Sequence, residues 1–201
     1  MNTCEKTIYE NEFFEDINYE EFNFKNCEFI SCKFKNVNFS EANISNSRFS
    51  SCHFYICDMK NVSCTNSAFT NCNFENTNLF LSTFKECKMT GSNFADSNIV
   101  GLNIVCGDWS YTNLRNANFK NHKLENINFE RADLSETTFE NAKLININFS
   151  YAILNRCLFI NADLRESSLN NTPIRNIILK DTKVNLETAL LISEAYGGIC
   201  I

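Results

Sequence analysis

Apolar side chains recur at every fifth position over most of this chain. From Phe14 to Val184, all 35 positions in the series are apolar, although only 44% of the chain is hydrophobic. The period fits neither regular element, because a helix turns by about 100° per residue and a strand alternates its faces at every residue. The backbone must turn between repeats, so that each fifth side chain points at one axis. This pattern predicts a solenoid of five-residue repeats over residues 12–184.

A second inward position lies two residues before each of these apolar residues. From Glu12 to Thr182, 27 of 35 such residues are Ala, Ser, Thr, Cys, Gly or Val. A large side chain beside a small one fills a narrow core without voids. The three remaining positions are mostly Asn, Ser, Thr, Lys and Glu, as expected for a solvated outer wall.

The repeat units resemble those of pentapeptide-repeat proteins. Residues 117–121, 132–136 and 162–166 (ANFKN, ADLSE and ADLRE) match that family's A-(D/N)-(L/F)-x-x unit. The resemblance implies an all-β solenoid, a right-handed quadrilateral β-helix with four pentapeptides per coil and about nine coils in this chain. A 20-residue period, as expected for such a coil, is visible in the series Phe14, Phe34, Phe54, Phe74 and Phe94.

The two ends of the repeat are predicted to be closed. Residues 1–11 are predicted to form an N-terminal cap. After Val184 the pattern changes: Asn185 suits a helix N-cap, residues 186–196 have helical character, and Gly197 and Gly198 follow. Residues 185–201 are therefore predicted to form a short C-terminal α-helix cap with a dimerisation tail.

The predicted C-terminal helix is more apolar than packing on one coil requires. It is either a simple cap or a cap that also pairs with a two-fold mate. We favour the dimer, because the gyrase-directed branch of the pentapeptide-repeat family is similar in this region. The predicted interface comprises Leu186, Leu190, Leu191, Ile199 and Ile201.

Negative charge is concentrated at the start of the chain. Residues 1–30 carry eight acids and two bases, whereas the remaining residues carry sixteen of each. This charge either prevents end-to-end stacking of coils or serves a binding partner. No basic stripe exists, so direct binding of nucleic acid is not expected.

The eleven cysteines are interpreted as packing residues. Most occupy inward positions, and their spacings reproduce the period of five instead of forming CxxC pairs. We therefore expect no metal and no disulfide framework, in a reducing cytoplasm. Cys32 and Cys52, in neighbouring predicted layers, lie within disulfide reach. The N-terminus lacks a secretory pattern, and no apolar run is long enough to span a membrane.

No set of residues predicts catalysis. The chain has two histidines, His53 and His122, and neither has a nucleophile and an acid at a plausible spacing. Glycine-rich phosphate loops are absent. We therefore predict no catalytic, cofactor-binding or metal-binding residues and expect that the protein is not an enzyme.

Two stretches are similar to Qnr-type quinolone-resistance proteins and to their mycobacterial fluoroquinolone-resistance and albicidin-resistance relatives. Residues 84–94 (FKECKMTGSNF) resemble that group's F-R-E-C-D-L-K-G-A-N-F stretch, and residues 51–58 (SCHFYICD) resemble its C-R-F-Y-Q-C-D run. The resemblance implies a bacterial, cytoplasmic homodimer that binds DNA gyrase and/or topoisomerase IV and protects against quinolones or another topoisomerase poison. The alternatives are a cytosolic protein-interaction scaffold of the wider family and a self-immunity factor against a natural gyrase toxin.

Two observations qualify this resemblance. Qnr proteins interrupt the solenoid with two loops, whereas the five-residue register of this chain never breaks. Double-stranded DNA carries one charge per roughly 1.7 Å, so a rod of about 42 Å would need on the order of 25 negative charges. The net charge here is −6, so any DNA mimicry must rest on a DNA-like rod shape and on local acidic patches such as Asp133, Glu136 and Glu140.

One wall carries apolar residues where the repeat normally has polar ones. Phe80, Leu81 and Val100 lie in adjacent predicted coils. Contiguous exposed apolar residues are typical of an interaction site, although neutral drift can produce the same pattern. The candidate partner contacts are therefore Phe80, Leu81, Val100, Asp133, Glu136 and Glu140.

Overall fold

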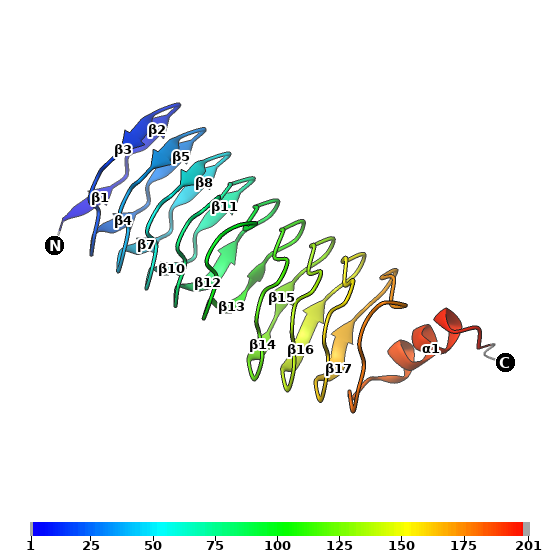
Figure 1. Ribbon diagram of the computed structural model, residues 1–201. Coiled ribbons are helices and arrows are strands. Elements are labelled where there is room, and N and C mark those ends of the chain that lie inside the picture. Colours follow the sequence, from blue (N-terminus) through cyan, green and yellow to red (C-terminus); the bar gives the residue numbers. More distant parts are fainter. Residues whose placement is uncertain (1, 199–201) are drawn as a thin grey trace. The chain divides into compact units, whose positions relative to one another are not determined.

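The computed structural model describes residues 2–198, and the chain falls into two compact units that divide after Asn113. The first unit is a parallel β-solenoid with strands β1 (Thr3–Glu5), β2 (Ile8–Glu10), β3 (Phe13–Glu15), β4 (Asn23–Lys25), β5 (Glu28–Ile30), β6 (Lys33–Lys35), β7 (Asn43–Ser45), β8 (Arg48–Ser50), β9 (His53–Tyr55), β10 (Ser63–Thr65), β11 (Ala68–Thr70), β12 (Thr83–Lys88) and β13 (Asn103–Asp108). The second unit is also a parallel β-solenoid, with strands β14 (Lys123–Glu125), β15 (Ile127–Asn128), β16 (Lys143–Asn148) and β17 (Asp163–Ser168) and the helix α1 (Leu186–Ala195). The predicted all-β solenoid with a short C-terminal helix is therefore confirmed (Figure 1).

In the first unit, strands pair in parallel with strands 20 residues further along the chain, as in Thr3↔Asn23 and Phe34↔Phe54. Three walls of the first three coils contain such rows, and later coils continue the third wall through single bridges such as Asn73↔Asn93. Figure 1 shows the row β1-β4-β7-β10-β12, and the other two rows are β2-β5-β8-β11 and β3-β6-β9. The fourth wall is held by single bridges such as Asn38↔Asp58. Each coil therefore contains four pentapeptides, as predicted.

The repeat begins earlier than the sequence pattern indicated. The predicted cap at residues 1–11 instead contains β1 and β2, which pair with β4 and β5 in the same 20-residue register as later strands. Cys4 and Tyr9 hold the central position in this coil, and the ring of Tyr9 stacks on Phe29 at 5.0 Å. A thiol and a phenol ring are apolar enough to extend the core.

A left-handed backbone residue marks the corners of the coils. The non-glycine residues at these corners have φ between +48° and +62°. Asn is common there because its short polar side chain tolerates this conformation better than most others. Ile56 and Leu81 are bulky apolar exceptions, with φ of +54° and +56°.

Stacked aromatic rings fill the core of the first unit. Phe54 lies between Phe34 and Phe74, with ring centroids 4.9 Å away on each side. Phe74 lies 4.8 Å from Phe94, which confirms the predicted column. Burial of each large side chain contributes about 1.5–3 kcal/mol, so this column is a main source of stability.

The small inward position also supplies hydrogen-bond donors. The Thr77 hydroxyl donates to Phe54 O at 3.0 Å, and the Ser92 hydroxyl donates to Phe69 O at 2.8 Å, in each case 23 residues earlier. Thiols of inward cysteines make the same contact at longer distances. Ser92 Oγ also accepts a hydrogen bond from Cys72 N–H at 3.0 Å. These bonds satisfy backbone groups that are buried inside the coil.

In the second unit, β16 pairs with β14 and β17. Phe139 and Phe159 stack in the core of this unit, with ring centroids 4.9 Å apart. Helix α1 begins as predicted, because Asn185 Oδ1 accepts a hydrogen bond from Thr188 N–H at 2.8 Å. Within residues 2–198, no helix is long and apolar enough to cross a membrane.

Candidate functional site

The first unit exposes the three apolar residues that were predicted as partner contacts. The exposed fractions are 39% for Phe80, 51% for Leu81 and 62% for Val100. Phe80 and Val100 are 20 residues apart in successive coils, and Leu81 N–H donates to Val100 O at 3.1 Å. Gly101 leaves room for this group, because a Cβ there would lie 2.6 Å from Leu81 Cδ2. We name Phe80, Leu81 and Val100 the Leu81 patch.

Leu81 adopts a backbone conformation that large apolar residues seldom hold. The left-handed region costs a non-glycine residue about 1–2 kcal/mol. Ile56 has a similar φ and a similar exposed fraction of 49%. However, the corner positions 20 residues away from Ile56 are Asn36 and Asn76, so Ile56 is surrounded by polar corners. Leu81 therefore differs from Ile56 in having an exposed apolar residue, Val100, on the adjacent coil.

The predicted acidic contacts lie in the second unit, where ion pairs neutralise them. Asp133 lies 3.4 Å from Arg115, and Glu136 lies 3.9 Å from Arg115 and 3.7 Å from Arg156. The structure therefore brings Asp133 and Glu136 together around one guanidinium group. Glu140 belongs to a separate pair, 2.8 Å from Lys120 Nζ. The predicted local acidic patches are thus mixed-charge networks, because opposite charges occupy neighbouring coils.

Helix α1 carries the described part of the predicted dimer interface. Leu186 and Leu190, four residues apart on one helix face, are 76% and 40% exposed, whereas Leu191 is half-buried. Arg175 anchors the helix to the last coil, because its Nε donates to Ala195 O at 2.9 Å. Ile199 and Ile201 lie outside the described residues.

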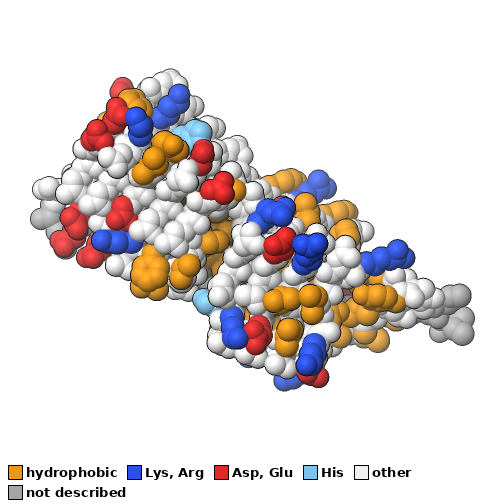
Figure 2. Space-filling model, in the orientation of Figure 1, with side chains coloured by type: hydrophobic (Ala, Val, Ile, Leu, Met, Phe, Trp, Pro, Cys, Tyr) orange, Lys and Arg blue, Asp and Glu red, His pale blue; other side chains and the backbone are white. Residues whose placement is uncertain are grey.

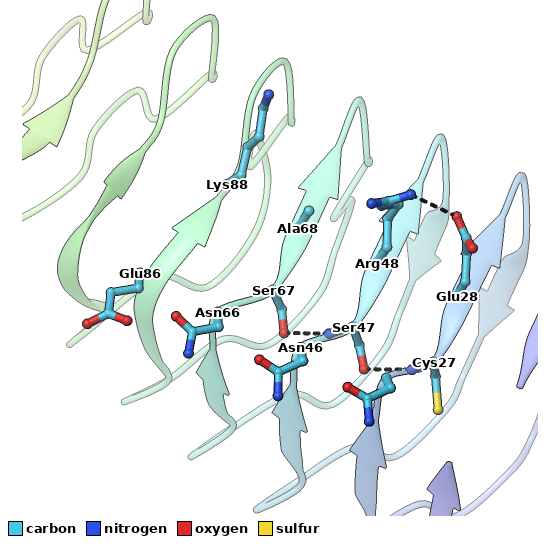
Figure 3. A pocket seen from close by; sticks show the side chains of 11 residues that line it. Cys27, Glu28, Asn46, Ser47, Arg48, Asn66, Ser67, Ala68, Glu86 and Lys88 are labelled. Atoms are coloured by element: carbon cyan, nitrogen blue, oxygen red, sulfur yellow. Dashed lines mark hydrogen bonds and ion pairs between the residues drawn. The ribbon is translucent and has the colours of Figure 1, made fainter. Parts of the chain in front are cut away.

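A polar groove follows one corner of the first unit and has a volume of about 450 Å³ (Figure 3). Along its floor, the Ser47 hydroxyl accepts from Cys27 N–H and the Ser67 hydroxyl accepts from Ser47 N–H, both at 3.1 Å. On its wall, Ala68 occupies the ladder position between Arg48 and Lys88. This groove was not predicted, although Asn recurs every 20 residues along it, at positions 26, 46 and 66. Its lining consists of Asn26, Cys27, Glu28, Asn46, Ser47, Arg48, Asn66, Ser67, Ala68, Glu86 and Lys88.

The acidic start of the chain is partly compensated by the next coils. Figure 2 shows acidic side chains together with basic ones over the N-terminal strands. Glu15 lies 2.6 Å from Lys35 Nζ, and Glu28 lies 3.2 Å from Arg48. Because such exposed pairs contribute little stability, their main effect is to reduce the bare negative charge of this surface.

Most of the described cysteines are buried core residues, whereas Cys4 and Cys106 are half-buried. Burial raises the pKa of the Cys57 thiol to about 11 and that of Cys157 to about 12. Thiols with such values are protonated at neutral pH and are weak nucleophiles. Within residues 2–198, no group of His, Cys, Asp and Glu has a geometry that could hold a metal ion.

Comparisons with known proteins agree with this architecture. A family model for pentapeptide repeats matches residues 21–55, 57–101, 112–150 and 142–181, in eight copies. A search of curated proteins found no match.

Solved structures of QnrB1, described as a plasmid-mediated fluoroquinolone resistance protein, share the fold. A trypsin-treated variant of QnrB1 has a TM-score of 0.65 and 20% identity, with 100% of both chains covered. Full-length QnrB1 has a TM-score of 0.54 and 20% identity, with 94% of this chain and 99% of that chain covered.

Proposed function

Because this chain belongs to the pentapeptide-repeat family, we propose that it is a binding protein without enzymatic activity that acts on DNA gyrase and/or topoisomerase IV. It protects them against quinolones or another topoisomerase poison. The observation that carries the proposal is the match to a fluoroquinolone resistance protein over 100% of both chains. In this proposal the protein is a homodimer in the bacterial cytoplasm, paired through Leu186, Leu190, Leu191, Ile199 and Ile201.

The Leu81 patch is the proposed contact with the topoisomerase. Exposed apolar residues at the centre of an interface supply most of the binding free energy when a partner removes them from water. Leu81 and Val100 are each more than half exposed, so they have apolar surface to bury.

Charge has a smaller part in this proposal. Asp133, Glu136 and Glu140 are ion-paired within the second unit, so they do not imitate a row of phosphates. We propose them as secondary polar contacts that exchange their basic partners for groups on the enzyme. Resemblance to DNA then rests on the width of the square coil.

A supercoiling assay tests this function. Purified protein at micromolar concentration is added to gyrase holoenzyme with and without ciprofloxacin, and drug-induced DNA cleavage is measured in parallel. We expect the protein to restore supercoiling and to reduce cleavage in the presence of the drug. If the protein neither inhibits gyrase nor restores supercoiling in the presence of the drug, the result would favour a protein-interaction scaffold. Protection of gyrase only against a natural toxin would indicate a self-immunity factor.

A matched pair of variants tests the contact surface. Leu81→Asn and Ile56→Asn make the same change at corners with the same backbone conformation and nearly equal exposure. Effects on stability should therefore be similar. We expect only Leu81→Asn to raise the protein concentration needed for rescue, by about tenfold, which corresponds to ~1.4 kcal/mol of binding free energy. Equal behaviour of the two variants would exclude the Leu81 patch as the contact.

A further inference from the structure

Two cysteine pairs bring sulfur atoms close together inside the first unit. Cys4 Sγ and Cys27 Sγ are 3.2 Å apart, and Cys64 Sγ and Cys87 Sγ are 3.5 Å apart. Both pairs join residues 23 positions apart. In each pair, a cysteine at the central position meets a cysteine at the small inward position of the following coil.

Cys32 and Cys52, 20 residues apart, both hold the small inward position in successive coils. The Cys32 thiol is directed at Tyr9 O at 3.4 Å, and the Cys52 thiol is directed at Phe29 O at 3.3 Å. The Cys27 thiol makes the same kind of contact, with Cys4 O at 3.2 Å, so the 23-residue pairs are set apart by their short sulfur–sulfur distances. These distances favour the 23-residue pairs for oxidation over Cys32 and Cys52, which the layer spacing had suggested.

The two 23-residue pairs differ in access. Cys64 and Cys87 are 0% and 1% exposed, whereas Cys4 is half-buried beside the buried Cys27. A dissolved disulfide can reach a protein only through a sulfur that contacts solvent. Cys4 is the more exposed residue of its pair and is therefore the candidate for the first exchange, with Cys27 Sγ 3.2 Å from its sulfur.

We propose that Cys4 and Cys27 form a reversible disulfide in exchange with a small-molecule disulfide such as oxidised glutathione. The Cys4 thiolate attacks one glutathione sulfur, forms a mixed disulfide and releases one glutathione thiol. The Cys27 thiolate then attacks Cys4 Sγ and releases the second. The two cysteines lose two electrons and two protons, and oxidised glutathione gains them as two glutathione thiols.

Strand β1 can move far enough to allow a Cys4–Cys27 disulfide, and the disulfide would then restrain this strand. A disulfide has a sulfur–sulfur distance of about 2.05 Å, so the two sulfur atoms must approach by ~1.2 Å. Cys4 lies in β1, which pairs with β4 and with no other strand among residues 2–198. This strand can therefore shift more easily than one between two neighbours. Once formed, the bond ties β1 to the second coil and restrains local opening.

The environment of Cys27 slows the second exchange step. Burial, with a smaller contribution from the hydrogen bond to Cys4, raises the pKa of Cys27 to about 11. Its thiolate is therefore scarce at neutral pH. We expect glutathione bound to Cys4 to appear first and the protein disulfide to follow.

The test uses the folded full-length chain in mixtures of oxidised and reduced glutathione. Samples are alkylated at intervals, cut with trypsin and a Glu-specific protease, and analysed by mass spectrometry. The second protease is needed because Glu28 separates Cys27 from Cys32. We expect the Cys4–Cys27 link to form at least tenfold faster than a Cys64–Cys87 link, and reduced glutathione to reverse it.

Two variants complete the test. Cys27→Ser should keep the fold, because Ser47 and Ser67 hold the same position in the next coils, and glutathione should then remain on Cys4. The matched control Cys32→Ser should form the link at the wild-type rate. Persistent glutathione on Cys4 in the wild-type protein, or a link from Cys4 to Cys32 in equal yield, would overturn the proposal.

Discussion

Ser92 offers a direct test of how the square coil satisfies its buried backbone. The residue is 1% exposed, and its hydroxyl donates to Phe69 O at 2.8 Å while accepting from Cys72 N–H at 3.0 Å. Ser92→Ala removes both bonds without adding volume. Each buried polar group left unsatisfied costs about 1–3 kcal/mol. We therefore expect the free energy of unfolding to fall by about 2–4 kcal/mol.

Thermal and urea unfolding measure this loss. A destabilisation of 1 kcal/mol lowers the melting temperature by about 2–4 °C for a chain of this size, so Ser92→Ala should melt about 5–15 °C below the wild type. Ser92→Cys should lose less, because the inward Cys72 thiol reaches Phe49 O at 3.4 Å in the same way.

The matched control for this prediction is Ser63→Ala. Ser63 lies exposed on β10 of the same unit, so the substitution removes a hydroxyl without uncovering buried backbone groups. We expect a change within about 0.5 kcal/mol. If Ser92→Ala and Ser63→Ala melt at the same temperature, the hydroxyl bridge does not have the stabilising role assigned to it.

Three further changes test other parts of the molecule. Gly107→Ala should lower the free energy of unfolding by at least ~2 kcal/mol in urea, because Gly107 has φ of +124° and a Cβ there would clash with Cys87 O. Wild-type stability of this variant would refute the prediction. Leu190→Asp should give a monomer by light scattering, and an unchanged dimer would exclude the proposed interface. Hydrogen bonding to Arg165 lowers the pKa of Asp163 to about 2, so Arg165→Ala should return it towards ~3.9 in an NMR titration. Because the folded-state pKa is lowered, any stabilisation by this pair is present above the unfolded-state pKa and is lost as the pH falls towards 2.

The parts of the fold that repeat along the chain were predictable. The Phe34, Phe54 and Phe74 column follows from apolar residues at fixed intervals, since identical positions in successive coils must stack. The start of α1 was also predictable, because the Asn185 cap acts on a residue three positions away. The exposure of the Leu81 patch followed from its phase in the repeat.

The limits of the sequence pattern are visible at specific residues. The series of large apolar residues hid the first coil, because Cys4 is small and was not recognised as a core residue. The mixed-charge network around Arg115 was missed, since acids were counted without their neighbours in adjacent coils. The Ser92 bridge and the Cys4–Cys27 contact were missed because each joins two different walls of neighbouring coils.

The sequence by itself determined the architecture of this protein. A period of five with alternating large and small inward residues has one efficient packing solution, a square coil whose aromatic side chains stack. Only the tertiary structure decided which thiols meet and which acids are neutralised. Those outcomes depend on short contacts between neighbouring coils. Contacts between residues 23 positions apart join two different walls, and the five-residue pattern does not reveal them.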